Sequence, residues 1–261
     1  MTHMNRWLVI ACALGFAGQL GAGLTYRTET TTAGVRKRVM SGIVKVESGQ
    51  SRFDVTKSDE KMFEAGSVIL SSSTGSVITV LNPMKRTYYV IDFAKVASSV
   101  AETQKQLAPL VTIPKPVATV KSEGAGERVE GFPTKRWLVD ATIEIKTALD
   151  NSPKQITMRS EIWTTDKLPD AAASILDSSK LPGDPILDSL SAARAKMTGF
   201  PLKSVSVTKM TIAGSTTTST SRTSVTGIHN ATFLPSDFVI PAGYKRVDSP
   251  IDTMLNAFGS R

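Results

Sequence analysis

A long alternation of apolar and polar residues begins at Trp137 and constrains the fold more than any other feature. One face of this segment reads Trp137, Val139, Ala141, Ile143 and Ile145, and the other reads Arg136, Leu138, Asp140, Thr142, Glu144 and Lys146. Successive side chains of a β-strand point to opposite faces, so this pattern predicts a long strand with one buried face.

Similar segments with a period of two recur along the chain. We predict strands at 35–47, 51–56, 61–70, 76–81, 87–92, 117–121, 134–146, 155–164, 202–213 and 217–226. The Thr/Ser-dense segment GSTTTSTSRTSVT could be disordered, but threonine favours strands, and we expect it to form a hairpin with SVSVTKMTIAG. Connectors such as ESGQS and SEGAGE carry turn-forming residues. Because short turns join antiparallel neighbours, the sequence predicts a mainly β protein with a few helices, built on one large antiparallel sheet.

Helical patterns occur in two places. Residues 93–107 place Phe93, Val96, Val100 and Leu107 near one stripe, which predicts an amphipathic helix. Farther along, Asp170 and Asp184 are suited to cap two further helices, of which the second has Pro185 at its first position and ends at Gly199. We expect these later helices to form a lid inserted between strands, over 170–197.

The N-terminal 23 residues have the composition of a secretory signal peptide. A single positive charge at Arg6 precedes an apolar run over 7–17, which is too short to span a bilayer. We expect cleavage near Gly23, a single domain over 24–261, and a periplasmic or secreted protein with no transmembrane segment. VIAC ending at Cys12 resembles a lipobox, and lipidation there is the alternative. Loss of Cys12, the one cysteine, leaves no thiol for disulfides or catalysis.

The basic charge of the chain favours anionic partners. The formal net charge is +8, and loss of Arg6 with residues 1–23 leaves +7. Such a charge suits an anionic surface of the cell envelope, a polysaccharide or nucleic acid. However, the basic residues form dispersed pairs, such as Lys85 with Arg86 and Lys245 with Arg246, whereas nucleic-acid sites usually form one clustered patch. We therefore expect no nucleic-acid partner.

The sequence lacks the motifs of the common enzyme classes. Once His3 is removed, His229 is the one histidine, and no G-x-S-x-G nucleophile motif accompanies it. Phosphate-binding and dinucleotide-binding loops are also missing, and a zinc site would lack both thiolates and a second imidazole. An all-carboxylate calcium site stays open at DNSP or PGDPILD, and a carboxylate pair stays open at Asp140 and Glu144. We expect no enzyme activity, no cofactor and no resident metal.

Several motifs together resemble a family of exported bacterial proteins. GERVEGFPTKRWLV, SEIWTTDKLP and LPSDFVIPAGYKRV, with RFDV and VLNPMKRTYYVID in the first half, are similar to the DUF4412 type. This resemblance spans 36–247 and implies a LolA/LolB-like fold, in which helices lie over the concave side of a strongly curved antiparallel sheet. LolA-like relatives carry the acyl chains of lipoproteins in the space between sheet and helices. The resemblance therefore implies an apolar ligand and no catalytic residues.

The alternating strands and the helical segment 184–199 supply the residues of such a site. We predict an apolar cavity lined by Trp137, Val139, Ile143, Met158, Ile162, Leu190 and Met210. Its ligand would be a lipid, an acyl chain or another apolar small molecule. The alternative is that these residues pack as an ordinary filled core, in which case the chain is a non-catalytic structural or interaction protein of the cell envelope.

Overall fold

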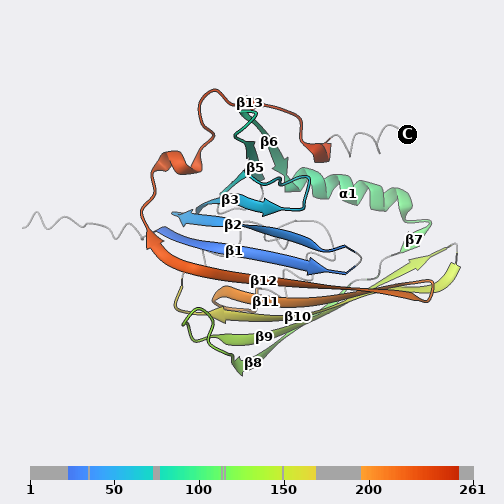
Figure 1. Cartoon of the computed structure of the whole chain (residues 1–261). Helices are drawn as coiled ribbons and strands as arrows, with labels where there is room; N and C mark the ends of the chain where they lie inside the picture. The colour runs from blue at the N-terminus through green and yellow to red at the C-terminus, as the bar shows by residue number, and fades with distance from the viewer. Residues whose placement is uncertain are drawn as a thin grey trace, which may run out of the picture.

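The computed structural model describes residues 23–34, 36–72, 77–112, 114, 116–148, 150–168 and 195–252. Its strands are β1 (Gly23–Ala33), β2 (Arg38–Glu47), β3 (Gln50–Ser58), β4 (Val68–Ser72), β5 (Val77–Asn82), β6 (Thr87–Asp92), β7 (Val111–Thr112), β8 (Val117–Ala125), β9 (Lys135–Thr147), β10 (Asp150–Thr165), β11 (Phe200–Ile212), β12 (Ser215–Ala231) and β13 (Lys245–Arg246). The helix α1 (Phe93–Leu107) lies between β6 and β7, and a short 3₁₀ helix, η3 (Pro235–Phe238), follows β12. Figure 1 shows this arrangement.

All the strands belong to one sheet. Their order is β13-β6-β5-β4-β3-β2-β1-β12-β11-β10-β9-β7, and β8 also pairs with β9. Every pair is antiparallel except β13 with β6. Two-residue turns with positive φ at both positions join β2 to β3 at Ser48 and Gly49, and β11 to β12 at Ala213 and Gly214. This geometry matches the twist of antiparallel strands. The predicted mainly β fold with one large antiparallel sheet is confirmed.

The chain path shows that the sheet is curved. The helix α1 leaves β6 near one edge of the sheet and leads to β7 at the opposite edge (Figure 1). Twelve strands in a flat sheet would be ~50 Å wide, whereas a helix of 15 residues is ~22 Å long. The two edges must therefore curl toward each other, so the sheet forms an open half-barrel.

The first turn of helix α1 packs against the core on the inner side of this half-barrel. Its bounds are those predicted from the sequence. Asp92 caps it, since Oδ1 of Asp92 accepts hydrogen bonds from the backbone N–H groups of Ala94 at 2.9 Å and Lys95 at 3.2 Å. Phe93 and Val96 are partly buried against the core. The predicted lid over 170–197 lies almost wholly outside the described residues, which exclude 169–194.

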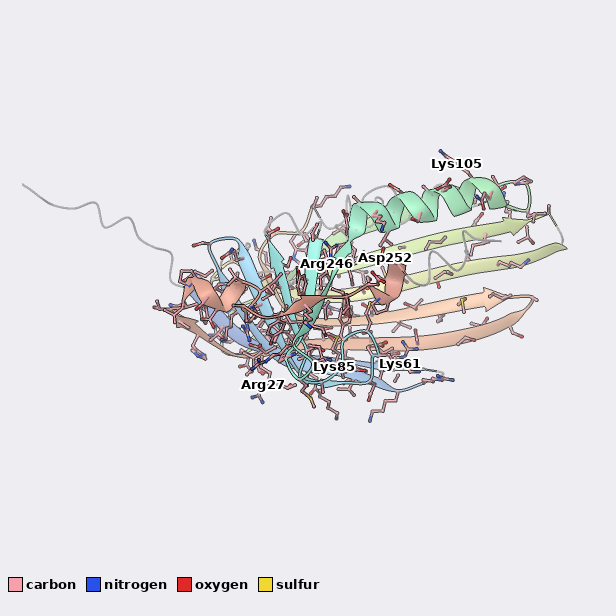
Figure 2. The ribbon with its side chains drawn as sticks, turned by 90° about the horizontal axis from the view of Figure 1, so that it is seen from above. Arg27, Lys61, Lys85, Lys105, Arg246 and Asp252 are labelled. Atoms are coloured by element: carbon pink, nitrogen blue, oxygen red, sulfur yellow. The ribbon has the colours of Figure 1, made fainter. Side chains whose placement is uncertain are left out.

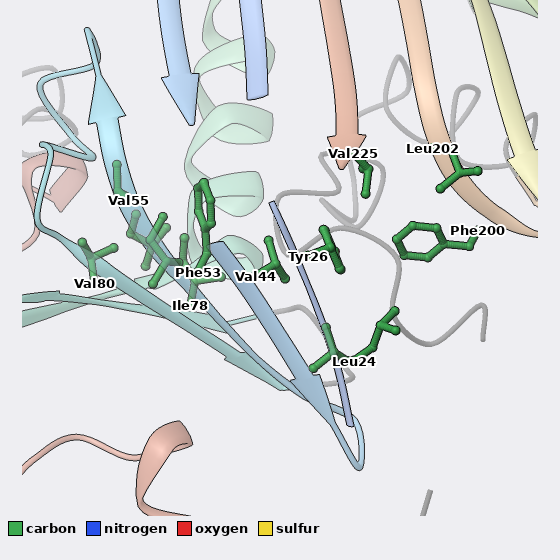
Figure 3. Close-up of a cluster of buried hydrophobic side chains, with 13 residues drawn as sticks. Leu24, Tyr26, Val44, Phe53, Val55, Ile78, Val80, Phe200, Leu202 and Val225 are labelled. Atoms are coloured by element: carbon green, nitrogen blue, oxygen red, sulfur yellow. The ribbon is translucent and has the colours of Figure 1, made fainter. Parts of the chain in front are cut away.

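The main core lies on the same inner side, and we call the face of the sheet that carries it the inner face. The cluster shown in Figure 3 comprises Leu24, Tyr26, Val44, Val46, Phe53, Val55, Ile69, Ile78, Val80, Ile91, Phe200, Leu202 and Val225. The rings of Tyr26 and Phe200 meet edge to face, with centroids 5.3 Å apart. This contact links β1 to the beginning of β11. A smaller cluster of Val68, Leu70 and Leu81 lies apart from this core.

The prediction of the first strands was partly wrong. It omitted β1, which lies between β2 and β12 near the middle of the sheet. Threonines occupy both faces of β1, so the hydrophobic alternation that marks other strands is missing. The strand predicted at 61–70 also begins later, at Val68. Gly66 has a φ of +86°, and the segment before it forms turns.

Candidate functional site

Six of the seven predicted site residues lie on the inner face. Trp137 of β9 is opposite Ile162 of β10, and Val139 is opposite Ser160. Met158 is opposite both Ala141 of β9 and Thr208 of β11, while Ile156 lies between Ile143 and Met210. Leu202, a core residue, is two positions from Ser204, which is opposite Ile162, so these rows continue the core face. Leu190 lies outside the described residues.

The burial of these residues decreases along the strands with distance from the core. Val139 is 3% exposed and Ile162 is 8% exposed, whereas Trp137, Ile143 and Met158 are half-buried. Met210 is 41% exposed, and Ile212, two residues farther on the same strand, is 46% exposed. The inner face of β9–β11 is therefore closed near the core and becomes accessible toward the turn between β11 and β12.

Trp137 is held by a polar contact on this face. Its indole Nε1 donates a hydrogen bond of 2.9 Å to Oγ1 of Thr164, and that hydroxyl donates one of 2.7 Å to the carbonyl of Thr198. A half-buried indole N–H normally needs such a partner. The position of Trp137 on the apolar face is as predicted.

A group of hydroxyls, which the sequence analysis missed, separates the two apolar parts of the inner face. Thr30 and Thr223 share a hydrogen bond of 3.0 Å, Thr32 donates one of 3.4 Å to Ser221, and Ser160 and Ser206 share one of 2.7 Å. The register places these residues in two rows across β1, β12, β11 and β10. Alternating Ser and Thr in SVSVT and TSTSRTS was the signal that could have revealed this group.

The opposite, outer face of β9–β11 is charged. Arg136 pairs with Glu161 at 2.7 Å, and Asp140 lies 3.8 Å from Arg159. Lys203 pairs with Glu127 and lies 4.6 Å from the ring centroid of Trp163. A shallow hollow of about 360 Å³ is lined by Asp140, Ala141, Thr142, Thr157, Met158, Arg159, Val207 and Lys209. Most of these residues belong to the outer face, so this hollow is not the predicted apolar site.

The remaining candidate groups are His229 and two tyrosines whose pKa values are raised. Nδ1 of His229 lies 3.0 Å from the carbonyl oxygen of Gly227, on an exposed part of β12. Burial raises the pKa of Tyr26, and burial followed by the charge of Glu64 raises the pKa of Tyr89 to about 12. The hydroxyl of Tyr89 donates to the carbonyl of Met62. Among the described residues, no cluster of three His, Cys, Asp or Glu side chains is arranged to hold a metal ion. The same part of the chain contains no helix that is long and apolar enough to cross a membrane.

Comparisons with solved structures give distant similarities. The chain is similar to a LolA superfamily protein of Nitrosomonas europaea at 9% identity and a TM-score of 0.30, over 84% of this chain and 90% of that one. It is also similar to a chain of the MucA/MucB complex of Pseudomonas aeruginosa, at 8% identity and a TM-score of 0.23, over 80% and 94% of the two chains. No curated protein matches the sequence.

A family comparison is more direct. Residues 40–244 match the family described as Domain of unknown function (DUF4412), which covers most of the chain and every strand from β3 to β12. The motifs GERVEGFPTKRW and SEIWTTDKLP lie within this match, on the hairpin before β9 and at the end of β10. The chain therefore belongs to the DUF4412 family.

Proposed function

We propose that this protein is an exported, non-catalytic binding protein that holds an apolar ligand, such as an acyl chain, on the inner face of β9–β11. The observation that carries the proposal is the continuous apolar row from Ile143 through Ile156 to Met210, which is only partly buried. Soluble proteins usually cover such contiguous apolar surface or use it for binding.

The inner face has the chemistry that a hydrocarbon chain requires. Aliphatic side chains and methionines line it, and methionine adapts to irregular apolar shapes. Burying apolar surface contributes ~25 cal/mol per Å², or ~0.8 kcal/mol per CH₂ group, so even part of an acyl chain gives useful affinity. The hydroxyl rows at Thr223, Ser206 and Ser160 border this surface. The partly exposed hydroxyls of Thr223 and Ser206 would accommodate the polar end of an amphiphilic ligand.

Export to the periplasm or the medium is part of this proposal. The composition of residues 1–23 supports it. N-terminal sequencing of the exported protein tests this point. We expect a start near Leu24, whereas an acylated Cys12 start would show a lipoprotein.

The ligand is tested by extracting purified protein for lipid mass spectrometry and by displacement of a fluorescent fatty acid. Ile143→Ser and Met210→Ser should each weaken binding, because they place a hydroxyl in the apolar row. Val205→Ser, on the outer face of β11, is the matched control and should bind like the unmodified chain. Protein that carries no lipid and displaces no probe would remove the proposal.

The second candidate is a structural or interaction protein of the cell envelope with a filled core. The near-complete burial of Val139 and Ile162 favours it. If the core is filled, Val139→Ala should lower the stability, and no apolar probe should bind to the variant or to the unmodified chain. Retained probe binding would decide for the first candidate.

A further inference from the structure

Four exposed cationic residues from distant parts of the sequence lie on neighbouring backbone segments at one edge of the sheet. Lys85 and Arg86 belong to the turn between β5 and β6, and Lys245 and Arg246 form β13. The backbone N–H of Lys245 donates to the carbonyl of Arg86 at 2.9 Å, and β13 pairs with the first two residues of β6. We call these four residues the basic tip; Lys85 and Arg246 are labelled in Figure 2.

The basic tip is built on ordered backbone. The backbone N–H of Lys85 donates to Oδ1 of Asn82 at 3.0 Å, which fixes the turn. Tyr88 and Tyr244, which adjoin β13 and the turn, pack against the small cluster of Val68, Leu70 and Leu81. The backbone that carries the positive charges therefore does not need to be ordered when a partner binds, and this lowers the entropic cost of binding.

The cations of the basic tip differ in pairing from nine other basic residues in the described part of the chain, each of which makes an ion pair. Many basic residues elsewhere make ion pairs, for example Lys45 with Asp237, Lys95 with Asp252 and Arg136 with Glu161. Within the described residues, no carboxylate lies within ion-pair distance of any member of the basic tip. The nearest acid in the sequence is Asp248, two residues after Arg246, so these segments carry four positive charges and one negative charge.

Two exposed apolar side chains lie beside these cations in the sequence. Met84, at the turn beside Lys85, is 94% exposed, and Val247, which follows Arg246, is 43% exposed. A soluble polyanion would use the charges but not the methionine. A lipid bilayer with an anionic surface uses both, because the cations meet headgroups while a flexible apolar side chain enters the interface.

We propose that the basic tip, with Met84 at its end, docks on the surface of an anionic phospholipid bilayer. Attraction to such a surface contributes about a fivefold gain in affinity for each cation. The four together give at least ~100-fold, which makes a reversible peripheral contact at about 0.1 M salt. This docking is independent of any ligand on the inner face.

The test is co-sedimentation of purified protein with vesicles of equal parts phosphatidylglycerol and phosphatidylcholine, compared with vesicles of phosphatidylcholine alone. The test variant combines Lys85→Gln, Arg86→Gln, Lys245→Gln and Arg246→Gln. The control variant combines Lys57→Gln, Lys105→Gln, Lys209→Gln and Arg222→Gln, which removes equal charge from exposed positions. Thermal melts establish that both variants fold, and Lys85→Gln alone provides a milder version.

We expect binding to the anionic vesicles only, at least ~100-fold weaker for the tip variant and about fivefold weaker for Lys85→Gln. The control variant should lose far less affinity for the anionic vesicles. Met84→Ser should weaken vesicle binding several-fold and leave binding to heparin unchanged. Equal losses in the tip and control variants would overturn the proposal in favour of general electrostatics. Heparin binding that depends on the tip, with no effect of Met84→Ser on vesicles, would instead identify a site for a soluble polyanion.

Discussion

The indole of Trp137 and the hydroxyl of Thr164 join adjacent strands through a hydrogen bond of 2.9 Å. Because Thr164 in turn donates to the carbonyl of Thr198 at 2.7 Å, the contact connects β9 and β10 to the segment that leads into β11. Thr164 is almost fully buried, at 2% exposure. This relay therefore fixes the end of β10 nearest the core and positions Phe200 and Leu202, which fill the core directly after it.

Trp137 contributes to stability through both this bond and its ring. Trp137→Phe keeps most of the apolar surface and should cost ~1 kcal/mol, the net value of one hydrogen bond. Trp137→Ala should cost more, but less than the ~3–5 kcal/mol of a fully buried aromatic residue, since the ring is half-buried. Urea unfolding of the two variants measures both differences. Equal stability of both variants with the unmodified chain would contradict the relay.

Gly42 allows close packing at the centre of the core. A Cβ at this position would lie 2.2 Å from the carbonyl oxygen of Asp54 and 2.5 Å from the ring of Phe53. The carbonyl belongs to the neighbouring strand β3 and cannot move cheaply. Gly42→Ala should therefore lower the stability by ~1–3 kcal/mol.

The control for Gly42 is a double variant with Phe53→Leu. The smaller side chain relieves the contact with the ring but not the one with the carbonyl, so Gly42→Ala should still be destabilising in that background. A thermal melt reports each variant. If Gly42→Ala caused no loss of stability in the Phe53→Leu background, only the contact with the ring would matter.

The parts of the fold that the sequence predicted are those in which side chains alternate in hydrophobicity. The alternation of Trp137 with its neighbours located β9 and its inner face, and the stripe at Phe93 and Val96 located α1. The strand β1 was missed because Thr28 and Thr30 line the inner face with hydroxyls. A prediction based on alternating hydrophobicity does not detect such a strand. Burial along a row depends on what packs opposite the strand, so the sequence could not distinguish buried Val139 from exposed Met210.

Tyr89 makes the stability fall at alkaline pH. Its pKa in the folded protein is about 12, above the ordinary value of 10, because burial and the charge of Glu64 disfavour the phenolate. Between these two values the unfolded chain loses a proton that the folded chain keeps, so the stability contribution is complete below pH 10 and is lost as the pH rises toward 12. Tyr89→Phe should remove this decline and cost ~1 kcal/mol near neutral pH through the lost bond to Met62.

Urea unfolding at about pH 8 and about pH 11 measures this effect. Tyr26, whose pKa is also raised by burial, adds a decline to both proteins. The informative quantity is therefore the fall in the free energy of unfolding from about pH 8 to about pH 11, compared between the unmodified chain and Tyr89→Phe. An equal fall in the two proteins would contradict the role of Tyr89.

The hydroxyl rows on the inner face should behave as coupled pairs. Ser160 is 4% exposed, and its Oγ lies 2.7 Å from Oγ of Ser206. Ser206→Ala leaves the buried hydroxyl of Ser160 without this partner, which should cost ~1–3 kcal/mol, whereas replacing both serines by alanine should cost little more or even less. A double-mutant cycle by urea unfolding gives the coupling energy directly. The matched control is the pair of Thr211 and Thr216, whose hydroxyls are 3.0 Å apart and lie in an exposed position. Thr→Val changes there should show almost no coupling, because water replaces the lost partner. Equal coupling in the two pairs would show that water reaches Ser160 as well, and that the inner face between β10 and β12 is open rather than enclosed.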